Sequence, residues 1–329
     1  MTAAERTVTE SAAERTGPGP AGRAPFGARL AAAMDAVGPL CLGIDPHPGL
    51  LKDWGLEDTA AGLEAFSLTA LEAAVNGGDP LVAALKPQVA LYERHGSAGM
   101  AALERLLAEA AAEGLLTIAD AKRGDIGSTM AGYAAAWLAD GSPLAADAVT
   151  LSPYLGFESL RPALDLAQHT GRGVFVLALT SNPEGACVQH VGHDVGSVAS
   201  AASGPAAGAW PAEAAPGAAS GSVAARIVAA AAAENARVAG EDRLGPVGLV
   251  VGATVAEQAR ALGIDLAAVR GALLAPGFGA QGATAEGMRT GFADAWPAVL
   301  ATSSRGILKA GPTVSGLVQA LQEARADLG

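Results

Sequence analysis

The chain has 329 residues, a formal net charge of −12, a hydrophobic share of 50% and few aromatic residues, at 4%. That length suits one large domain or two ordinary ones, with a core built mainly from small aliphatic side chains. An acidic chain without a lysine- or arginine-rich block argues against a nucleic-acid surface, although a local cationic pocket can still bind an anionic metabolite. No uncharged apolar segment reaches ~18 residues, so we expect no membrane span.

The first 24 residues contain three glutamates and lack the apolar segment of a signal peptide. With the glycines and prolines of 17–20, they are expected to form a disordered tail in front of a single domain over 25–329. Cys41 lies in an apolar run and Cys187 in an expected loop, which does not suggest a disulfide framework. This cysteine usage is typical of a reducing cytoplasm, where we expect the protein to be located.

Short apolar runs alternate with alanine-rich helical segments along the rest of the chain. Strands that alternate with helices indicate parallel βαβ units, and eight such units in about 300 residues favour a (β/α)8 TIM barrel. In this fold, functional residues lie where strands end and the following loops begin. The expected strands are 40–45, 81–86, 115–122, 148–153, 174–180, 247–253, 272–276 and 303–308. The expected helices lie near 60–75, 97–113, 128–139, 157–169, 222–240, 254–262, 284–299 and 313–327.

Residues 187–222 interrupt this alternation after the fifth expected strand. Within it, residues 197–222 are nearly all Ala, Ser, Gly and Pro, with Trp210 as their one bulky residue, so we interpret the stretch as a low-complexity loop insertion. A flexible appendage is the favoured role, with a lid over the site as the alternative. The stretch begins with Cys187, His190 and His193, which could bind zinc, but no second ligand cluster matches them.

Charged residues gather at the end of the third expected strand. Asp120 and Lys122 alternate with small apolar residues and therefore point to the same face of the strand, while Asp125 follows in the loop. Lys86 ends the neighbouring apolar run. Buried charges are costly unless paired, so the plain alternative is a structural ion pair. Alternating signs let all four groups stay ionised.

The pattern Asp-x-Lys-x-x-Asp, filled by Asp120, Lys122 and Asp125, resembles the signature of the orotidine 5'-phosphate decarboxylase superfamily. Together with Lys86 in Ala-Leu-Lys-Pro-Gln, it is similar to the longer bacterial branch of the decarboxylase family. The resemblance extends from about residue 26 to the end of the chain, except near 187–222. It implies a decarboxylase of orotidine 5'-monophosphate in pyrimidine biosynthesis that needs no cofactor and no metal.

The resemblance also implies roles for single residues. Lys122 would stabilise the carbanion and protonate C6, within a catalytic network of Lys86, Asp120, Lys122 and Asp125. Asp125 and Thr129 would reach into the partner's site of a homodimer. Asp45, Thr129, Ser181, Gln281, Arg305 and Gly306 would bind the substrate, with Asp45 on the ribose hydroxyls, Ser181 on the pyrimidine ring, and Gln281 and Arg305 on the phosphate.

The phosphate assignment has independent support. Glycines of 276–282 can turn backbone N–H groups inward, and loops after the last two strands of such barrels commonly bind phosphate. Taken singly, Asp45 is equally well a turn residue, Lys86 a lysine that reaches the surface, and the segment at Ser181 an ordinary turn. Two functional alternatives also remain: a metal-dependent sugar-phosphate decarboxylase or synthase of the same superfamily, and an inactive nucleotide-binding barrel.

Overall fold

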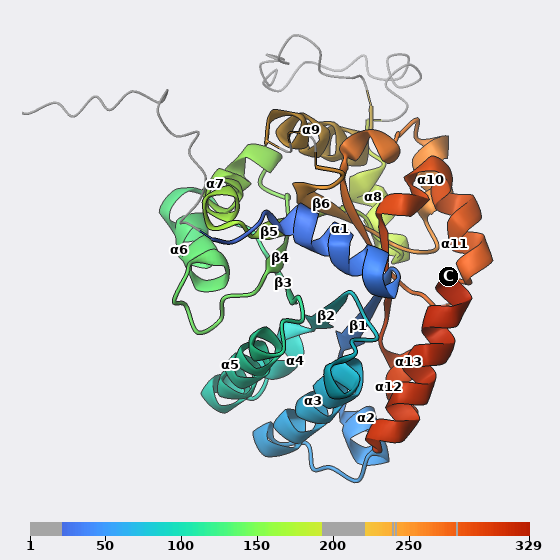
Figure 1. Cartoon of the computed structure of the whole chain (residues 1–329). Helices are drawn as coiled ribbons and strands as arrows, with labels where there is room; N and C mark the ends of the chain where they lie inside the picture. The colour runs from blue at the N-terminus through green and yellow to red at the C-terminus, as the bar shows by residue number, and fades with distance from the viewer. Residues whose placement is uncertain (1–21, 193–220, 239, 241, 281) are drawn as a thin grey trace, which may run out of the picture.

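Eight parallel strands alternate with helices around a barrel in the computed structural model, which describes residues 22–192, 221–238, 240, 242–280 and 282–329 (Figure 1). The strands are short and almost entirely buried, because helices cover their outer faces. They are β1 (Leu40–Ile44), β2 (Ala84–Pro87), β3 (Ile118–Arg123), β4 (Ala148–Leu151), β5 (Gly173–Leu179), β6 (Gly245–Val251), β7 (Gly271–Pro276) and β8 (Val299–Ser303).

The strands pair in the order β2-β1-β8-β7-β6-β5-β4-β3, so β2 and β3 stand at the two ends of this order. Isolated bridges between Leu85 and Thr117 and between Gln88 and Asp120 connect these two strands. The backbone N–H of Leu85 also donates to the carbonyl of Leu116 at 2.8 Å. The sheet therefore curves back on itself, as the (β/α)8 interpretation of the sequence requires, and that prediction is confirmed.

The helices surround the barrel, and their apolar faces pack on the outward-facing strand residues in one large core. No helix in the described ranges is long and apolar enough to cross a membrane. The α-helices are α1 (Phe26–Val37), α2 (Pro48–Asp53), α3 (Ala60–Val75), α4 (Val89–Glu93), α5 (Gly96–Ala112), α6 (Gly127–Leu138), α7 (Arg161–Thr170), α8 (Ala186–Gln189), α9 (Val223–Val238), α10 (Ala256–Ala261), α11 (Ala285–Phe292), α12 (Arg305–Leu308) and α13 (Val314–Leu328).

A second core fills the interior of the barrel and joins it to α1, the helix that precedes the first strand. Phe26 of α1 meets Phe175 of β5 edge-to-face with ring centroids 5.9 Å apart. Inward-facing residues such as Ile118 and Leu300 belong to the same cluster. Because side chains alternate along a strand, the next inward position of β3 after Ile118 is Asp120. The interior is thus apolar near the amino ends of the strands and polar near their carboxyl ends.

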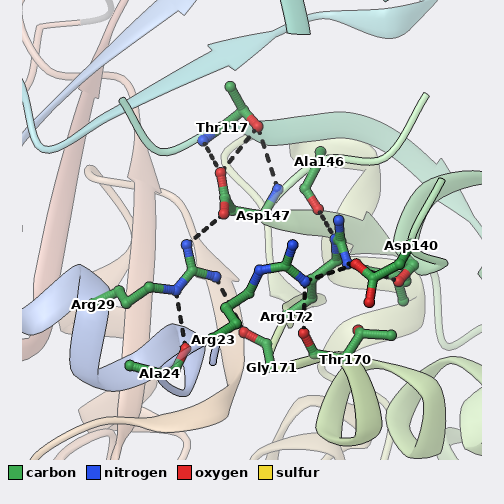
Figure 2. A network of polar contacts seen from close by, with 11 residues as sticks. Arg23, Ala24, Arg29, Thr117, Asp140, Ala146, Asp147, Thr170, Gly171 and Arg172 are labelled. Carbon is green, nitrogen blue, oxygen red and sulfur yellow. Dashed lines mark hydrogen bonds and ion pairs between the residues drawn. The ribbon is translucent and has the colours of Figure 1, made fainter. Parts of the chain in front are cut away.

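A polar network ties α1 to the amino ends of the strands (Figure 2). Arg29 donates to Asp147 at 2.5 Å and to the carbonyl of Gly171. The other carboxylate oxygen of Asp147 accepts from the backbone N–H of Thr117 at 3.0 Å. Arg23 bonds Asp140 at 2.8 Å, so residues just before α1 also contact the barrel. Helix α1 and the residues before it therefore cover the amino ends of the strands, and the open end of the barrel is the one at the carboxyl ends.

The prediction of the eighth strand at 303–308 is wrong. The strand is Val299–Ser303, and Arg305–Leu308 forms the short helix α12. The side chains of 299–303 are all buried, so their apolar pattern fits the end of a helix as well as a strand. For this reason the sequence pattern extends the preceding helix to residue 299. Pro297, in the 3-10 turn that follows α11, was the available signal for the break.

The expected tail and insertion fall largely outside the description of the structure. Residues 1–21 and 193–220 lie outside the described residues, so the expectations of a disordered tail and of a flexible appendage or lid stay predictions. Cys187 is exposed in α8, and Cys41 is buried within the barrel interior.

Candidate active site

The inward-facing positions at the carboxyl ends of the strands bring most of the expected site residues together. Lys86 lies near the carboxyl end of β2, Asp120 and Lys122 lie near that of β3, and Asp45 directly follows β1. Together with Ser181 and Arg305 they line one cavity of about 260 Å³ at the open end of the barrel. This is the position at which barrels of this type place their functional groups.

The carboxylate of Asp120 is the centre of a hydrogen-bond network. Its Oδ2 accepts from Nζ of Lys86 at 2.9 Å and from Nε2 of Gln88 at 3.1 Å. Its Oδ1 accepts from Nζ of Lys122 at 2.6 Å and from Oγ1 of Thr150 at 2.9 Å. Two bonds to each oxygen fill the acceptor capacity of the carboxylate. Asp120 is therefore held in one orientation before any ligand arrives.

The two lysines differ in exposure. The side chain of Lys86 is 4% exposed and also lies 3.7 Å from Oδ1 of Asp45, whereas that of Lys122 is 46% exposed. Lys86 is thus a buried counter-charge between two carboxylates, and Lys122 is the ammonium that a ligand in the cavity can reach. The attraction to two acidic neighbours offsets the free-energy cost of removing this cation from water.

The charges stabilise one another's ionised forms. Burial alone would raise the pKa of Asp120, but Lys86 and Lys122 outweigh it and hold this pKa well below its usual range. Burial would likewise lower the pKa of Lys86, but Asp120 and Asp45 reverse the effect and raise it. Beneath them, burial raises the pKa of the Cys41 thiol to about 12, so it stays neutral. The network therefore carries fixed charges at neutral pH.

Three buried polar atoms around the cavity have no hydrogen-bond partner among the described residues: Oδ1 of Asp45, Oγ1 of Thr302 and Oγ of Ser304. Unsatisfied buried groups are rare in folded proteins, so their grouping at one cavity indicates polar ligand atoms. Gly43 makes room for the side chain of Ser304, because a Cβ at position 43 would lie 2.9 Å from Cβ of Ser304.

The expected phosphate residues lie at one side of the cavity, after β7 and β8. Arg305 is exposed at the start of α12, and no carboxylate in the described part of the chain pairs with it. Gly306 follows it, and a Cβ there would lie 3.0 Å from Oγ of Ser303. Gln281 lies outside the described residues, although its neighbour Ala280 lines the cavity. An unpaired guanidinium at the cavity rim can bind a phosphate in bidentate geometry.

Asp125 and Thr129 lie apart from this cavity. Oδ1 of Asp125 accepts from the backbone N–H of Ile126 at 2.8 Å, and Thr129 is exposed in α6. Neither residue lines the cavity, so within one chain the ion pairs join Asp120 to the two lysines but not Asp125 to either.

A family model for the "Orotidine 5'-phosphate decarboxylase / HUMPS family" matches residues 38–319, the whole barrel from β1 into α13. The chain belongs to this family. It is 50% identical to the orotidine 5'-phosphate decarboxylase of Streptomyces coelicolor over 293 residues, 89% of this chain and 93% of the relative. It is 49% identical to that of Salinispora arenicola over 302 residues, 92% and 96% of the two chains.

A crystal structure of a family member agrees with the fold. The protein is from Streptomyces avermitilis and is provisionally called an orotidine 5'-phosphate decarboxylase. It matches with a TM-score of 0.77 and 49% identity, covering 93% of this chain and 95% of that one. Membership of the orotidine 5'-phosphate decarboxylase / HUMPS family, inferred from Asp120, Lys122 and Asp125, is therefore confirmed.

Several polar residues in this chain, in or next to the cavity, were not expected from the sequence. Gln88, Thr302 and Ser304 line the cavity, and Thr150, which does not line it, donates a hydrogen bond to Asp120. The period-2 alternation that placed Asp120 and Lys122 on one face could have found Gln88. Thr150 looked like an ordinary β-branched strand residue, and the misplaced eighth strand concealed Thr302.

The possible zinc ligands Cys187 and His190 lie on and just after α8, and His193 lies outside the described residues. Within the described ranges, no group of three or more His, Cys, Asp or Glu is arranged to hold a metal ion.

Proposed function

We propose that this protein converts orotidine 5'-monophosphate to uridine 5'-monophosphate and CO2, a step of de novo pyrimidine biosynthesis, without a cofactor. The observation that carries the proposal is the buried Lys86–Asp120 pair with the accessible ammonium of Lys122 beside it at the cavity. The relatives that are about half identical over most of the chain are named for this activity.

The reaction needs a fixed cation at the reacting carbon. Breaking the bond between C6 and the carboxyl carbon releases CO2 and leaves the electron pair on C6. An ammonium held in place beforehand stabilises that developing charge and then donates its proton to C6. Lys122 has the required exposure, and Asp120 keeps it oriented at 2.6 Å. Asp120 stays ionised at neutral pH, because the two lysines hold its pKa low.

Other groups around the cavity suit the ribose, the pyrimidine ring and the phosphate of the substrate. Oδ1 of Asp45, which accepts no hydrogen bond from the described residues, suits a ribose hydroxyl, and Ser181, which also lines the cavity, suits the pyrimidine ring. Arg305, with Gly306 and Gln281, suits the phosphate. Phosphate binding far from C6 can still lower the barrier if it drives closure of the site.

The alternative is a metal-dependent member of the same family, whose description covers more than the decarboxylases. Lys86 argues against it. Its ammonium lies 2.9 Å from Asp120 and 3.7 Å from Asp45, so it occupies the space between the two carboxylates and offsets part of their charge. A divalent cation would have to displace this buried charge.

The proposal includes a two-fold dimer, in which Asp125 and Thr129 reach the site of the partner. Asp125 does not contact the lysines of its own chain, and large apolar residues are exposed nearby. Ile126 lies beside Asp125, and Tyr154 (80% exposed) and Leu155 follow the adjacent strand β4. Exposed apolar groups of this size commonly mark an interface. The expected location in the cytoplasm stays a prediction.

The test is to mix the purified protein with orotidine 5'-monophosphate and follow the absorbance change to uridine 5'-monophosphate, with and without EDTA. We expect turnover that EDTA does not alter. Loss of turnover on chelation, restored by magnesium, would favour the metal-dependent alternative. Tight binding of the nucleotide without any turnover would identify an inactive binding barrel.

A further inference from the structure

The hydroxyl of Thr150 lies between the two residues that matter most to the proposed chemistry. Thr150 is buried on β4, faces the barrel interior, and its Oγ1 donates to Oδ1 of Asp120 at 2.9 Å. The same Oγ1 accepts from the backbone N–H of Lys122, also at 2.9 Å. An N–H can only donate, so the single hydroxyl proton is directed to the carboxylate.

This contact repairs a break in the ladder between β3 and β4. Ala119 pairs with Val149 and Arg123 pairs with Leu151, so β3 advances four residues while β4 advances two. The extra residues leave the backbone of Asp120–Lys122 without regular partners on β4, as in a β-bulge. The side chain of Thr150 supplies the acceptor that the N–H of Lys122 would otherwise lack.

The backbone of Lys122 is strained at this position. Its φ is +48°, in the left-handed region that residues with a Cβ rarely adopt. Such a conformation persists only where the surroundings fix it, and strained residues of this kind gather at functional sites. Here the surroundings are Thr150 at the N–H and Asp120 at the ammonium.

We propose that Thr150 is a positioning residue, whose hydroxyl fixes the backbone of Lys122 and the carboxylate of Asp120 relative to each other. The inference rests on the proposed decarboxylation, in which Lys122 must meet C6 in one geometry. Small displacements of a reacting group cost orders of magnitude in rate. Thr150 acts through Lys122 and Asp120, because Thr150 does not line the cavity.

The test compares Thr150→Val, which replaces the hydroxyl with a methyl, with Thr150→Ser, which keeps the hydroxyl. We expect kcat to fall about 100-fold in the valine variant and less than about threefold in the serine variant. KM and the affinity for uridine 5'-monophosphate should change little in either, since the ribose and phosphate groups lie elsewhere. Thr170→Val is the matched control: this buried hydroxyl donates to the carbonyl of Leu166 in α7, and its loss should leave kcat unchanged.

If the role of Thr150 were merely structural, the valine variant would be less stable, but it would not show a fall in kcat with an unchanged KM. Full kcat in a folded Thr150→Val protein would overturn the proposal, as would equal losses in the serine and valine variants. Thr150→Ala and Thr150→Ser form a second pair that differs only in the hydroxyl, in case valine does not fold. If loss of the hydroxyl unfolds both proteins, the role is structural and the proposal is wrong.

Crystal structures of the serine and valine variants test the geometry independently of turnover. We expect the backbone of Lys122 to leave φ near +48° in the valine variant alone, or the carboxylate of Asp120 to rotate. Unchanged positions of both residues would contradict the proposal. A wild-type protein that does not turn over the substrate would contradict the proposed function, whereas this structural comparison would still decide the role of Thr150.

Discussion

Nζ of Lys86 lies 2.9 Å from Oδ2 of Asp120, although the two residues are 34 positions apart and both are buried. Breaking a buried pair by removal of one partner costs about 3–5 kcal/mol, because the other charge is left uncompensated. Stability alone does not explain the pair, because two apolar residues of similar volume often give a folded protein of equal stability. In the proposed mechanism, the pair keeps a carboxylate ionised beside the accessible ammonium of Lys122.

Replacing Lys122 with alanine should abolish turnover and leave the protein folded. In the proposed mechanism the same ammonium stabilises the carbanion and supplies the proton, so we expect kcat to fall on the order of 10⁴-fold or more. Circular dichroism and thermal unfolding monitor the fold. Lys52→Ala is the control, because Lys52 is an exposed lysine of α2 that does not line the cavity. Activity of folded Lys122→Ala within tenfold of the wild type would refute the mechanism.

Arg305→Ala should weaken binding of the phosphorylated substrate. Hydrogen bonds to charged groups contribute about 1.5–3 kcal/mol, so kcat/KM should fall about 10- to 100-fold. If phosphate binding drives closure of the site, part of this loss will appear in kcat. Orotidine, which lacks the phosphate, is the matched control and should react almost equally with mutant and wild type. Equal impairment on orotidine would mean that Arg305 does not bind the phosphate.

The stability of the protein should depend on pH through Asp120. Its pKa in the folded state lies below the usual value of about 3.9 in an unfolded chain. Its contribution is therefore present above about pH 4 and is lost as the pH falls through the folded-state value. The difference in free energy of unfolding between the wild type and Asp120→Asn should shrink below about pH 4.

Asp140 provides the control for this pH dependence. Hydrogen bonds from Arg172 and Arg23 lower the pKa of Asp140 to about 2, but its side chain is half-exposed. Solvent screening limits such pairs, so Asp140→Asn should cost under about 1 kcal/mol at pH 7. Chemical unfolding between pH 2 and 7 measures both variants. A constant difference between wild type and Asp120→Asn across this range would contradict the low pKa of Asp120.

Mixing two inactive variants should restore activity if Asp125 serves the partner's site. In a mixed dimer of Lys122→Ala and Asp125→Ala, one site collects both changes and the other collects neither. After random exchange of equal amounts, half the dimers are mixed and half of their sites are intact, so activity should reach about a quarter of wild type. Subunit exchange without recovered activity would show that Asp125 acts in its own chain.

The sequence by itself determined the alternation of strands and helices and the charged residues that the structure gathers at the carboxyl ends of the strands. Apolar runs separated by helical segments predict a barrel, because buried parallel strands are apolar on both faces. The same local rule, side-chain alternation, placed Asp120 and Lys122 on one face of β3. Charged residues at the end of an apolar strand stood out because burial of charge is costly.

Only the tertiary structure decided which groups meet across strands. Residues at the end of a helix and at the start of the next strand are both buried and apolar, so the sequence pattern does not mark the boundary between them. The predicted position of β8 was therefore wrong by several residues. The contact between Thr150 and Asp120 joins two strands through a break in their ladder, and no local pattern reports such a register. Likewise, the separation of Asp125 from the lysines follows from the path of the loop after β3. Side-chain periodicity is local, whereas register and loop path depend on the packing of the whole barrel.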